Sequence, residues 1–160
     1  MKIILQRVKN ASVLIGGKTT GRIEAGYLLL TGFERNDDSS FLEPMIEKIR
    51  KINLFPDKNG RFAHSLEEIK GSLLVISQFT LFANLKKGKK PSWSKALEPE
   101  KARKLFEEFI SLLRKSGILV EEGAFGTEMQ VSLQNDGPVT IILDSRELFP
   151  SLYKIVTASK

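Results

Sequence analysis

The side chains best suited to chemistry in this 160-residue sequence are neutral hydroxyl and amide groups set in otherwise apolar stretches. The run from residue 71 to residue 82 turns polar near its end, at Ser77, Gln78 and Thr80. A second set, Asn135 and Thr140, flanks a polar break between two apolar runs. Buried hydroxyl and amide groups need hydrogen-bond partners. These residues therefore predict either a satisfied polar network or a site that could stabilise an oxyanion.

The polar break reads Asn135-Asp136-Gly137-Pro138. Residues of these types are typical of a β-hairpin turn, and such turns usually carry no function. Pro138, however, stands directly against the apolar run that begins at Val139, and proline cannot donate a hydrogen bond to a strand ladder. Because a cis peptide costs least before proline, the alternative is a loop with a fixed and unusual backbone shape.

Composition excludes several kinds of reaction centre. The chain has no cysteine, so disulfides and thiolate metal sites are excluded. The single histidine, His64, lies in an apparent turn region and is expected to face solvent or to be structural. No metalloprotease motif or phosphate-binding P-loop occurs, and no base is visible that could activate a serine or threonine hydroxyl. We therefore expect neither a metal nor a cofactor.

Two motifs together, Ser77-Gln78-Phe79-Thr80-Leu81 and residues 135–140, resemble the signature motifs of the bacterial-type D-aminoacyl-tRNA deacylases, also called D-tyrosyl-tRNA deacylases. The resemblance extends to three further segments of the chain. They are the N-terminal residues Gln6-Arg7-Val8 with Ala11-Ser12-Val13, the loop at Lys90-Pro91-Ser92, and the stretch from Phe125 to Met129. The resemblance covers about residues 1–143.

This resemblance implies hydrolysis of the ester that joins a D-amino acid to the 3′-terminal ribose of a tRNA, and so chiral proofreading in translation. An aminoacyl ester is already activated, so a positioned water and an oxyanion site can suffice. On this resemblance we place Ser77 at the catalytic site and assign Gln78 and the backbone amide of Phe79 to the oxyanion. Thr80 is the family's candidate nucleophile. We prefer a positioning role for it, with the terminal 2′-hydroxyl assisting, because a threonine hydroxyl near its free pKa is a weak nucleophile.

The resemblance also implies a homodimer in which Gly137-Pro138, with a cis bond, enters the partner's site. Its carbonyls would accept hydrogen bonds from the substrate's α-amino group, and an L-amino acid would be excluded sterically. Glycine has no side chain to exclude, so glycyl-tRNA would also be cleaved. Asn135, Thr140, Phe125 and Met129 are assigned to substrate binding by the same resemblance.

The formal net charge of +6 suits an anionic partner such as tRNA, and it also suits plain solubility. The most basic stretch holds four lysines in five positions, Lys86, Lys87, Lys89 and Lys90. They must lie in an exposed loop, which either contacts tRNA phosphates or is a solvated surface. The chain has no apolar run of about 18 residues and no recognisable signal peptide. We expect a cytoplasmic protein with no membrane and no DNA partner.

The elements that position these residues can be read from periodicity and turn signals. Many strands with two helices and no regular βαβ alternation indicate an α+β fold. The resemblance implies a mixed, barrel-like two-sheet core with two main helices packed outside, in three layers (β/β/α). Strands are expected at residues 2–9, 11–15, 18–23, 27–33, 72–82, 118–120, 130–134 and 139–143, with hairpin turns at 16–17 and 56–60.

The first helix is expected within residues 39–51, where Ser40 and Glu43 have the spacing of a capping box. The second begins at Pro99, carries one apolar stripe and ends at Gly117.

Residues 1–143 are expected to form a single deacylase domain, with residues 144–160 as a C-terminal extension of open role. That extension could be a strap across the sheet, a dimer contact or a frayed tail. Two competing functions remain: a basic RNA-binding module without catalysis, and a metal-free hydrolase acting on a non-RNA ester. The paired motifs favour the deacylase, because a simple binding module would not need them.

Overall fold

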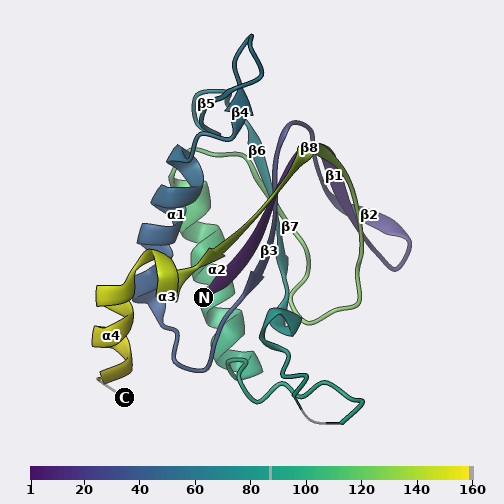
Figure 1. Ribbon diagram of the computed structural model, residues 1–160. Helices are drawn as coiled ribbons and strands as arrows, with labels where there is room; N and C mark the ends of the chain where they lie inside the picture. Colours follow the sequence, from purple (N-terminus) through teal and green to yellow (C-terminus); the bar gives the residue numbers. More distant parts are fainter. Residues whose placement is uncertain (87, 159–160) are drawn as a thin grey trace.

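A computed structural model describes residues 1–86 and 88–158 of the chain. A twisted sheet has two helices packed along one side, and the C-terminal helices lie beside the first of them (Figure 1). The strands are β1 (Lys2–Ile15), β2 (Lys18–Ile23), β3 (Gly26–Gly32), β4 (Phe55–Pro56), β5 (Phe62–His64), β6 (Ser72–Ser77), β7 (Val120–Glu122) and β8 (Gln130–Asp144). The α-helices are α1 (Leu42–Lys51), α2 (Pro99–Lys115), α3 (Ser145–Leu148) and α4 (Pro150–Ala158), with 3-10 turns η1 (Ser39–Phe41) and η2 (Phe79–Phe82).

The main sheet is organised around β1. One edge of β1 pairs antiparallel first with β3 and then with β2, while β8 pairs antiparallel along its other edge. β3 pairs in parallel with β6, and β6 pairs in parallel with β7. The strand order is therefore β2-β1-β3-β6-β7. β2 in turn comes close to β6 and β7, so the sheet nearly closes on itself. This is the mixed, barrel-like α+β architecture that the sequence analysis expected.

Two apolar clusters hold the layers together. The larger one lies between the sheet and the helices α1 and α2, and it includes the fully buried rings of Tyr27, Phe41, Phe106 and Phe109. The smaller one lies inside the curled part of the sheet and contains Val13, Leu28 and Leu74. Burial on both sides explains why β3 and β6 are continuous apolar runs.

The hairpin interpretation of residues 130–143 is wrong. Both apolar runs belong to one long strand, β8, and both pair with β1: Gln6 faces Thr140, and Val8 faces Asn135. Between these two pairs β1 advances by two residues, whereas β8 advances by five. The residues between Asn135 and Thr140 therefore bulge out of the ladder without reversing the chain. The first strand likewise does not stop at residue 9 but runs unbroken to Ile15.

Two other expectations need correction. β6 ends at Ser77 and the chain turns into the 3-10 turn η2, so the expected strand to residue 82 is wrong. The capping box at Ser40 and Glu43 is also wrong, because the side chain of Asp38 caps η1 by accepting from the Ser40 amide at 3.1 Å. Helix α2 begins with Pro99 and is followed by Gly117 at a φ of +84°, as expected.

The described part of the C-terminal extension is not frayed. α3 and α4 pack on the larger cluster, where Val156 is buried and the Tyr153 ring lies 6.1 Å from that of Phe41. The chain start is tied to the same region. The N-terminal ammonium of Met1 is buried, pairs with Asp37 and donates to the Ser145 hydroxyl at 2.9 Å. No helix among the described residues is long and apolar enough to cross a membrane.

Candidate functional site

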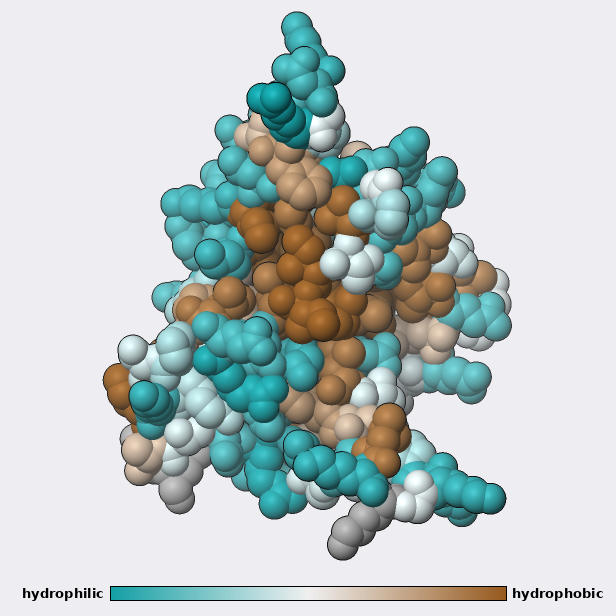
Figure 2. Space-filling model, viewed as in Figure 1, coloured by the Kyte–Doolittle hydropathy of each residue, from teal (hydrophilic) through white to brown (hydrophobic). Residues whose placement is uncertain are grey.

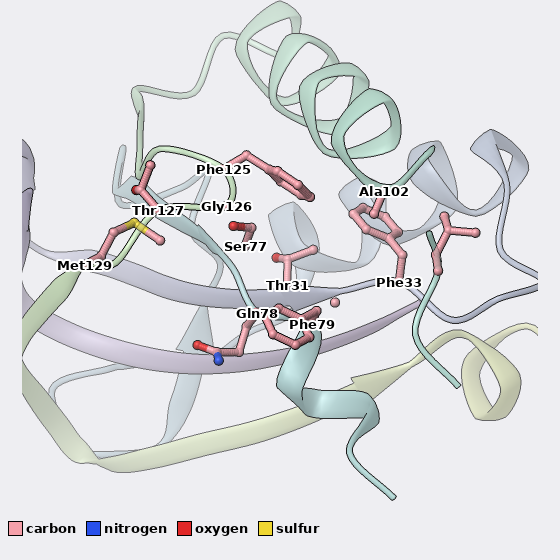
Figure 3. A pocket seen from close by; sticks show the side chains of 12 residues that line it. Thr31, Phe33, Ser77, Gln78, Phe79, Ala102, Phe125, Gly126, Thr127 and Met129 are labelled. Atoms are coloured by element: carbon pink, nitrogen blue, oxygen red, sulfur yellow. The ribbon is translucent and has the colours of Figure 1, made fainter. Parts of the chain in front are cut away.

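A pocket of about 170 Å³ opens at the carboxyl ends of the parallel strands β3 and β6. The pocket's other walls come from the start of α2 and from the loop that follows β7 (Figure 3). Its lining residues are Thr31, Gly32, Phe33, Ser77, Gln78, Phe79, Leu97, Ala102, Phe125, Gly126, Thr127 and Met129.

The first predicted motif turns sharply at this pocket. Ser77 is the last residue of β6, and the Gln78 amide donates to the Thr31 carbonyl at 2.7 Å. η2 then begins at Phe79, whose ring is 54% exposed. The first amides of a helical turn have no acceptor within the turn, so the amide of Phe79 is free of a helical partner. The structure thus brings Ser77, Gln78 and Phe79 to one pocket wall.

Thr80 lies one step further and does not line the pocket. Its side chain is exposed, and its hydroxyl accepts a hydrogen bond from the Gln78 side-chain amide. That bond fixes the orientation of the Gln78 amide. The geometry therefore connects Thr80 to the pocket through Gln78.

Gly32 is required for the close approach of β3 to this turn. A Cβ on Gly32 would lie 2.7 Å from the Gln78 carbonyl oxygen, which is backbone and cannot move aside cheaply. A glycine at the end of the apolar run 27–33 is a sequence signal of such a contact.

Thr31 was not predicted from the sequence, and its environment is unusual. The side chain is 1% exposed and lines the pocket next to Ser77, its neighbour in the parallel ladder. Its hydroxyl has no hydrogen-bond partner among the described residues. In Figure 3 the Thr31 and Ser77 side chains lie between the rings of Phe125 and Phe79. A buried hydroxyl without a partner is costly, so this group points to a ligand.

The opposite wall of the pocket is formed by the loop between β7 and β8, which carries the predicted residues Phe125 and Met129. The Phe125 ring packs 5.8 Å from the Phe106 ring of α2. The Arg103 guanidinium lies 4.8 Å from the Phe125 ring centroid, and it also donates to the Phe125 carbonyl at 3.4 Å. Helix α2 therefore fixes the position of this wall.

The second predicted motif lies away from the pocket of the same chain, since none of its residues lines it. Gly137 and Pro138 are exposed, and the peptide bond between them is cis. Asn135 holds the loop closed: its side-chain amide donates to the Val139 carbonyl at 3.1 Å, and its oxygen accepts from the Val139 amide at 2.8 Å. The Thr140 hydroxyl accepts from both Asn135 and Gln6.

A buried arginine anchors this loop from below. Arg7 Nε donates to the Asp136 carbonyl at 2.9 Å and lies 3.1 Å from the Asp136 carboxylate, and a second guanidinium nitrogen donates to the Leu54 carbonyl. The Arg7 side chain is only 7% exposed. The loop is therefore held in one orientation on the surface rather than left free.

The predicted lysine loop projects beyond η2. Its base is closed by paired backbone hydrogen bonds between Asn84 and Ser92, at 2.8 and 3.1 Å. Lys86, Lys89 and Lys90 are exposed, while Lys87 lies outside the described residues. His64, in β5, is exposed as expected.

The pocket itself is electrostatically neutral, because none of its described lining residues is ionisable. The resolved pKa shifts lie elsewhere; for example, burial raises the pKa of Tyr27 well above its usual value. Among the described residues, no three histidine, aspartate or glutamate side chains come together to hold a metal ion. The chemistry available at the pocket is therefore hydrogen bonding by hydroxyls and amides.

Comparison with known proteins places this geometry in context. The family model described as D-Tyr-tRNA(Tyr) deacylase matches residues 4–144. The D-aminoacyl-tRNA deacylase of Thermosipho africanus is 46% identical over 149 residues, which is 93% of this chain and all of that protein. That of Aquifex aeolicus is 44% identical over 148 residues, covering 92% of this chain and all of that protein.

Solved structures are similar as well. One described as the c-Myc DNA Unwinding Element Binding Protein superimposes with a TM-score of 0.84 at 39% identity, covering 91% of this chain and 99% of that one. A probable eukaryotic D-amino acid tRNA deacylase gives a TM-score of 0.78 at 16% identity, covering 89% and 98%. At that identity the second likeness speaks for the fold alone.

Proposed function

The chain belongs to the D-Tyr-tRNA(Tyr) deacylase family, and from this premise we propose how its pocket acts on a D-aminoacyl-tRNA. The enzyme is a D-aminoacyl-tRNA deacylase, a hydrolase that cleaves the ester between a D-amino acid and tRNA and so proofreads translation. Family membership over nearly the whole chain is the observation that carries this conclusion.

The neutral pocket supports a mechanism without a protein base. Water attacks the ester carbonyl carbon, the bond from that carbon to the ribose 3′ oxygen breaks, and the departing oxygen takes up the proton that the water loses. The neighbouring 2′-hydroxyl of the terminal adenosine relays this proton. No side chain that lines the pocket could do so by titrating.

The first motif would stabilise the charge that develops on the carbonyl oxygen. The Phe79 amide, at the start of η2, and the Gln78 side chain are hydrogen-bond donors at the pocket wall. Removing one such donor typically costs about 10²–10³ in rate. Thr80 acts through Gln78 in this scheme, because its hydroxyl accepts a hydrogen bond from the Gln78 side-chain amide.

Discrimination against L-amino acids is assigned to Gly137 and Pro138 of a second copy of the chain. Within one chain no residue of the loop lines the pocket, so in this proposal a partner brings the two motifs together. The exposed carbonyls of this rigidly held loop would accept hydrogen bonds from the α-amino group. Such contacts involve only backbone, which leaves the identity of the D-side chain open and admits glycyl-tRNA.

The surface around the loop supports a homodimer. β8 exposes Leu133 and Ile142 on either side of the loop, and Phe62 is exposed near Arg7. Figure 2 shows apolar side chains gathered on the face that β8 crosses. Contiguous exposed apolar surface on a soluble domain marks an interaction site.

One assay tests the proposed function directly. D-Tyr-tRNA, L-Tyr-tRNA and glycyl-tRNA are each incubated with the enzyme, and release of the amino acid is followed. We expect hydrolysis of the first and third but not the second. Binding without release of any amino acid would favour an RNA-binding module. Hydrolysis of simple esters but not of charged tRNA would favour a general esterase.

A matched pair of variants tests the dimer. Ile142 on β8 and Ile155 on α4 are both 64% exposed. Ile142→Glu is expected to yield monomers in sedimentation and to abolish activity, because each pocket loses its partner's loop. Ile155→Glu is expected to change neither. If Ile142→Glu remains dimeric and active, the interface does not include this face.

Because aminoacyl-tRNA is used by ribosomes, we place the enzyme in the cytoplasm.

A further inference from the structure

Two exposed aromatic rings meet at the mouth of the pocket. Phe79 is 54% exposed and Trp93 is 40% exposed, and their ring centroids are 5.0 Å apart at an interplanar angle of 77°. This edge-to-face arrangement is a favourable one for aromatic pairs. Both residues keep a large exposed surface beside this contact. Neither side chain belongs to the apolar clusters of the core.

The pair lies between the pocket and the lysine loop. Phe79 itself lines the pocket. Trp93 directly follows Ser92, where the backbone pairing with Asn84 closes the base of the loop. A molecule that extends out of the pocket along this side therefore meets the aromatic rings first and the lysines next.

The charge of the surrounding segment favours an anionic occupant. Residues 83–97 contain five lysines and no carboxylate side chain. Apolar protein partners would gain nothing from these cations, whereas a single-stranded nucleic acid offers both bases and phosphates. Proteins that hold single strands combine basic surface with aromatic rings on which bases stack, at about 1–3 kcal/mol per base.

We propose that Phe79 and Trp93 form a stacking platform for the unpaired base that precedes the terminal adenosine of the tRNA. This inference rests on the proposed function, which puts the terminal adenosine ester in the pocket. The preceding nucleotide then emerges at the ring pair, and its phosphate faces the lysine loop. The platform binds any base by its π-face, so it anchors the single-stranded end without reading the body of the tRNA.

Trp93 is the only tryptophan in the chain, so its fluorescence reports on the platform alone. Titration with the trinucleotide cytidylyl-cytidylyl-adenosine is expected to quench this emission in a saturable way. A trinucleotide analogue with the same phosphates but without bases at the first two positions is expected not to. Equal quenching by both compounds, or by neither, overturns the platform.

Kinetics give the second test. Trp93→Ala is expected to raise KM for D-Tyr-tRNA about tenfold, within the range for one lost stacked base, with kcat unchanged. Trp93→Phe should restore most of the loss. D-tyrosyl-adenosine, which lacks the preceding nucleotides, should be hydrolysed equally by the wild type and Trp93→Ala. The control is Leu85→Ala in the same segment, 72% exposed, which should leave KM unchanged.

The outcomes separate this proposal from the proposed function. If Trp93→Ala weakens both substrates equally, or neither, the platform is refuted while the deacylase stands. If the wild type cleaves no D-aminoacyl ester but the trinucleotide still quenches Trp93, the proposed function fails and the stacking surface remains.

Discussion

We expect Thr31→Val to separate stability from activity in this enzyme. The Thr31 hydroxyl is buried, lines the pocket and lacks a partner in the described chain. Valine has nearly the same shape and replaces the hydroxyl by a methyl group. An unsatisfied buried hydroxyl costs about 1–3 kcal/mol, so removing it should stabilise the free enzyme. For a domain of this length, each kcal/mol raises Tm by about 2–4 °C.

Activity should move in the opposite direction. If the Thr31 hydroxyl forms a hydrogen bond with the bound substrate, valine removes that bond from the complex. A neutral hydrogen bond contributes about 0.5–1.5 kcal/mol, which corresponds to a loss of about 2- to 12-fold in kcat/KM. The assays are thermal unfolding by circular dichroism and single-turnover hydrolysis of D-Tyr-tRNA.

Thr127→Val is the matched control, because Thr127 lines the same pocket but its hydroxyl donates to the Ala124 carbonyl at 3.0 Å. That substitution should lower Tm slightly, since it breaks a bond that the free enzyme already makes. The reasoning is refuted if Thr31→Val lowers Tm as Thr127→Val does, or if it leaves kcat/KM unchanged.

Three further predictions address the other parts of the site. Arg7→Met should lower stability by about 2–4 kcal/mol in urea unfolding and reduce D-Tyr-tRNA cleavage in the fraction that stays folded, because the loop loses its buried anchor; full activity in a folded variant would contradict this. The exposed lysines of the loop, Lys86, Lys89 and Lys90, can be replaced by alanine. This should reduce the slope of log tRNA affinity against log salt concentration by about 0.7–0.9 for each phosphate that the variant no longer binds. An unchanged slope would mean that the loop is only a solvated surface. Thr80→Ala should keep substantial activity, whereas a trapped acyl-Thr80 intermediate would restore covalent catalysis.

Local signals predicted the elements that local chemistry determines. The start and end of α2 follow from Pro99 and Gly117, and its apolar stripe is the face that packs on the sheet. The hairpin between β1 and β2 follows from Gly16 and Gly17, which both adopt positive φ. In each case the residues that define the feature are neighbours in sequence, so no knowledge of the rest of the fold is needed.

The errors arose where long-range pairing decides between equal local options. A polar break with glycine and proline suits a chain reversal and an outward bulge equally well. Only the register of β8 against β1 distinguishes them. The end of β6 is similar, because Phe79 and Leu81 are apolar enough for a strand, but the chain turns at Gln78 to bond the Thr31 carbonyl.

Much of the pocket could not be predicted for the same reason. Thr31, Leu97 and Ala102 come from segments far from both motifs. They meet because parallel pairing aligns Thr31 with Ser77, and because α2 packs over that end of the sheet. The sequence identified residues of two walls, at 77–79 and 125–129, and only the fold revealed the rest of the lining.

The N-terminal segment Gln6-Arg7-Val8 lies in the strand that connects the two motifs. Gln6-Arg7-Val8 matched the family pattern without an evident role in the sequence. In the fold, Gln6 donates to Thr140, and Arg7 holds Asp136 from the buried side. The same strand pairs with β3, which carries Thr31 at the pocket. In the dimer that we propose, β1 would therefore link the pocket of one subunit to the loop presented to the other. A change at Arg7 would then act on the partner's active site and leave the pocket lining of its own chain intact.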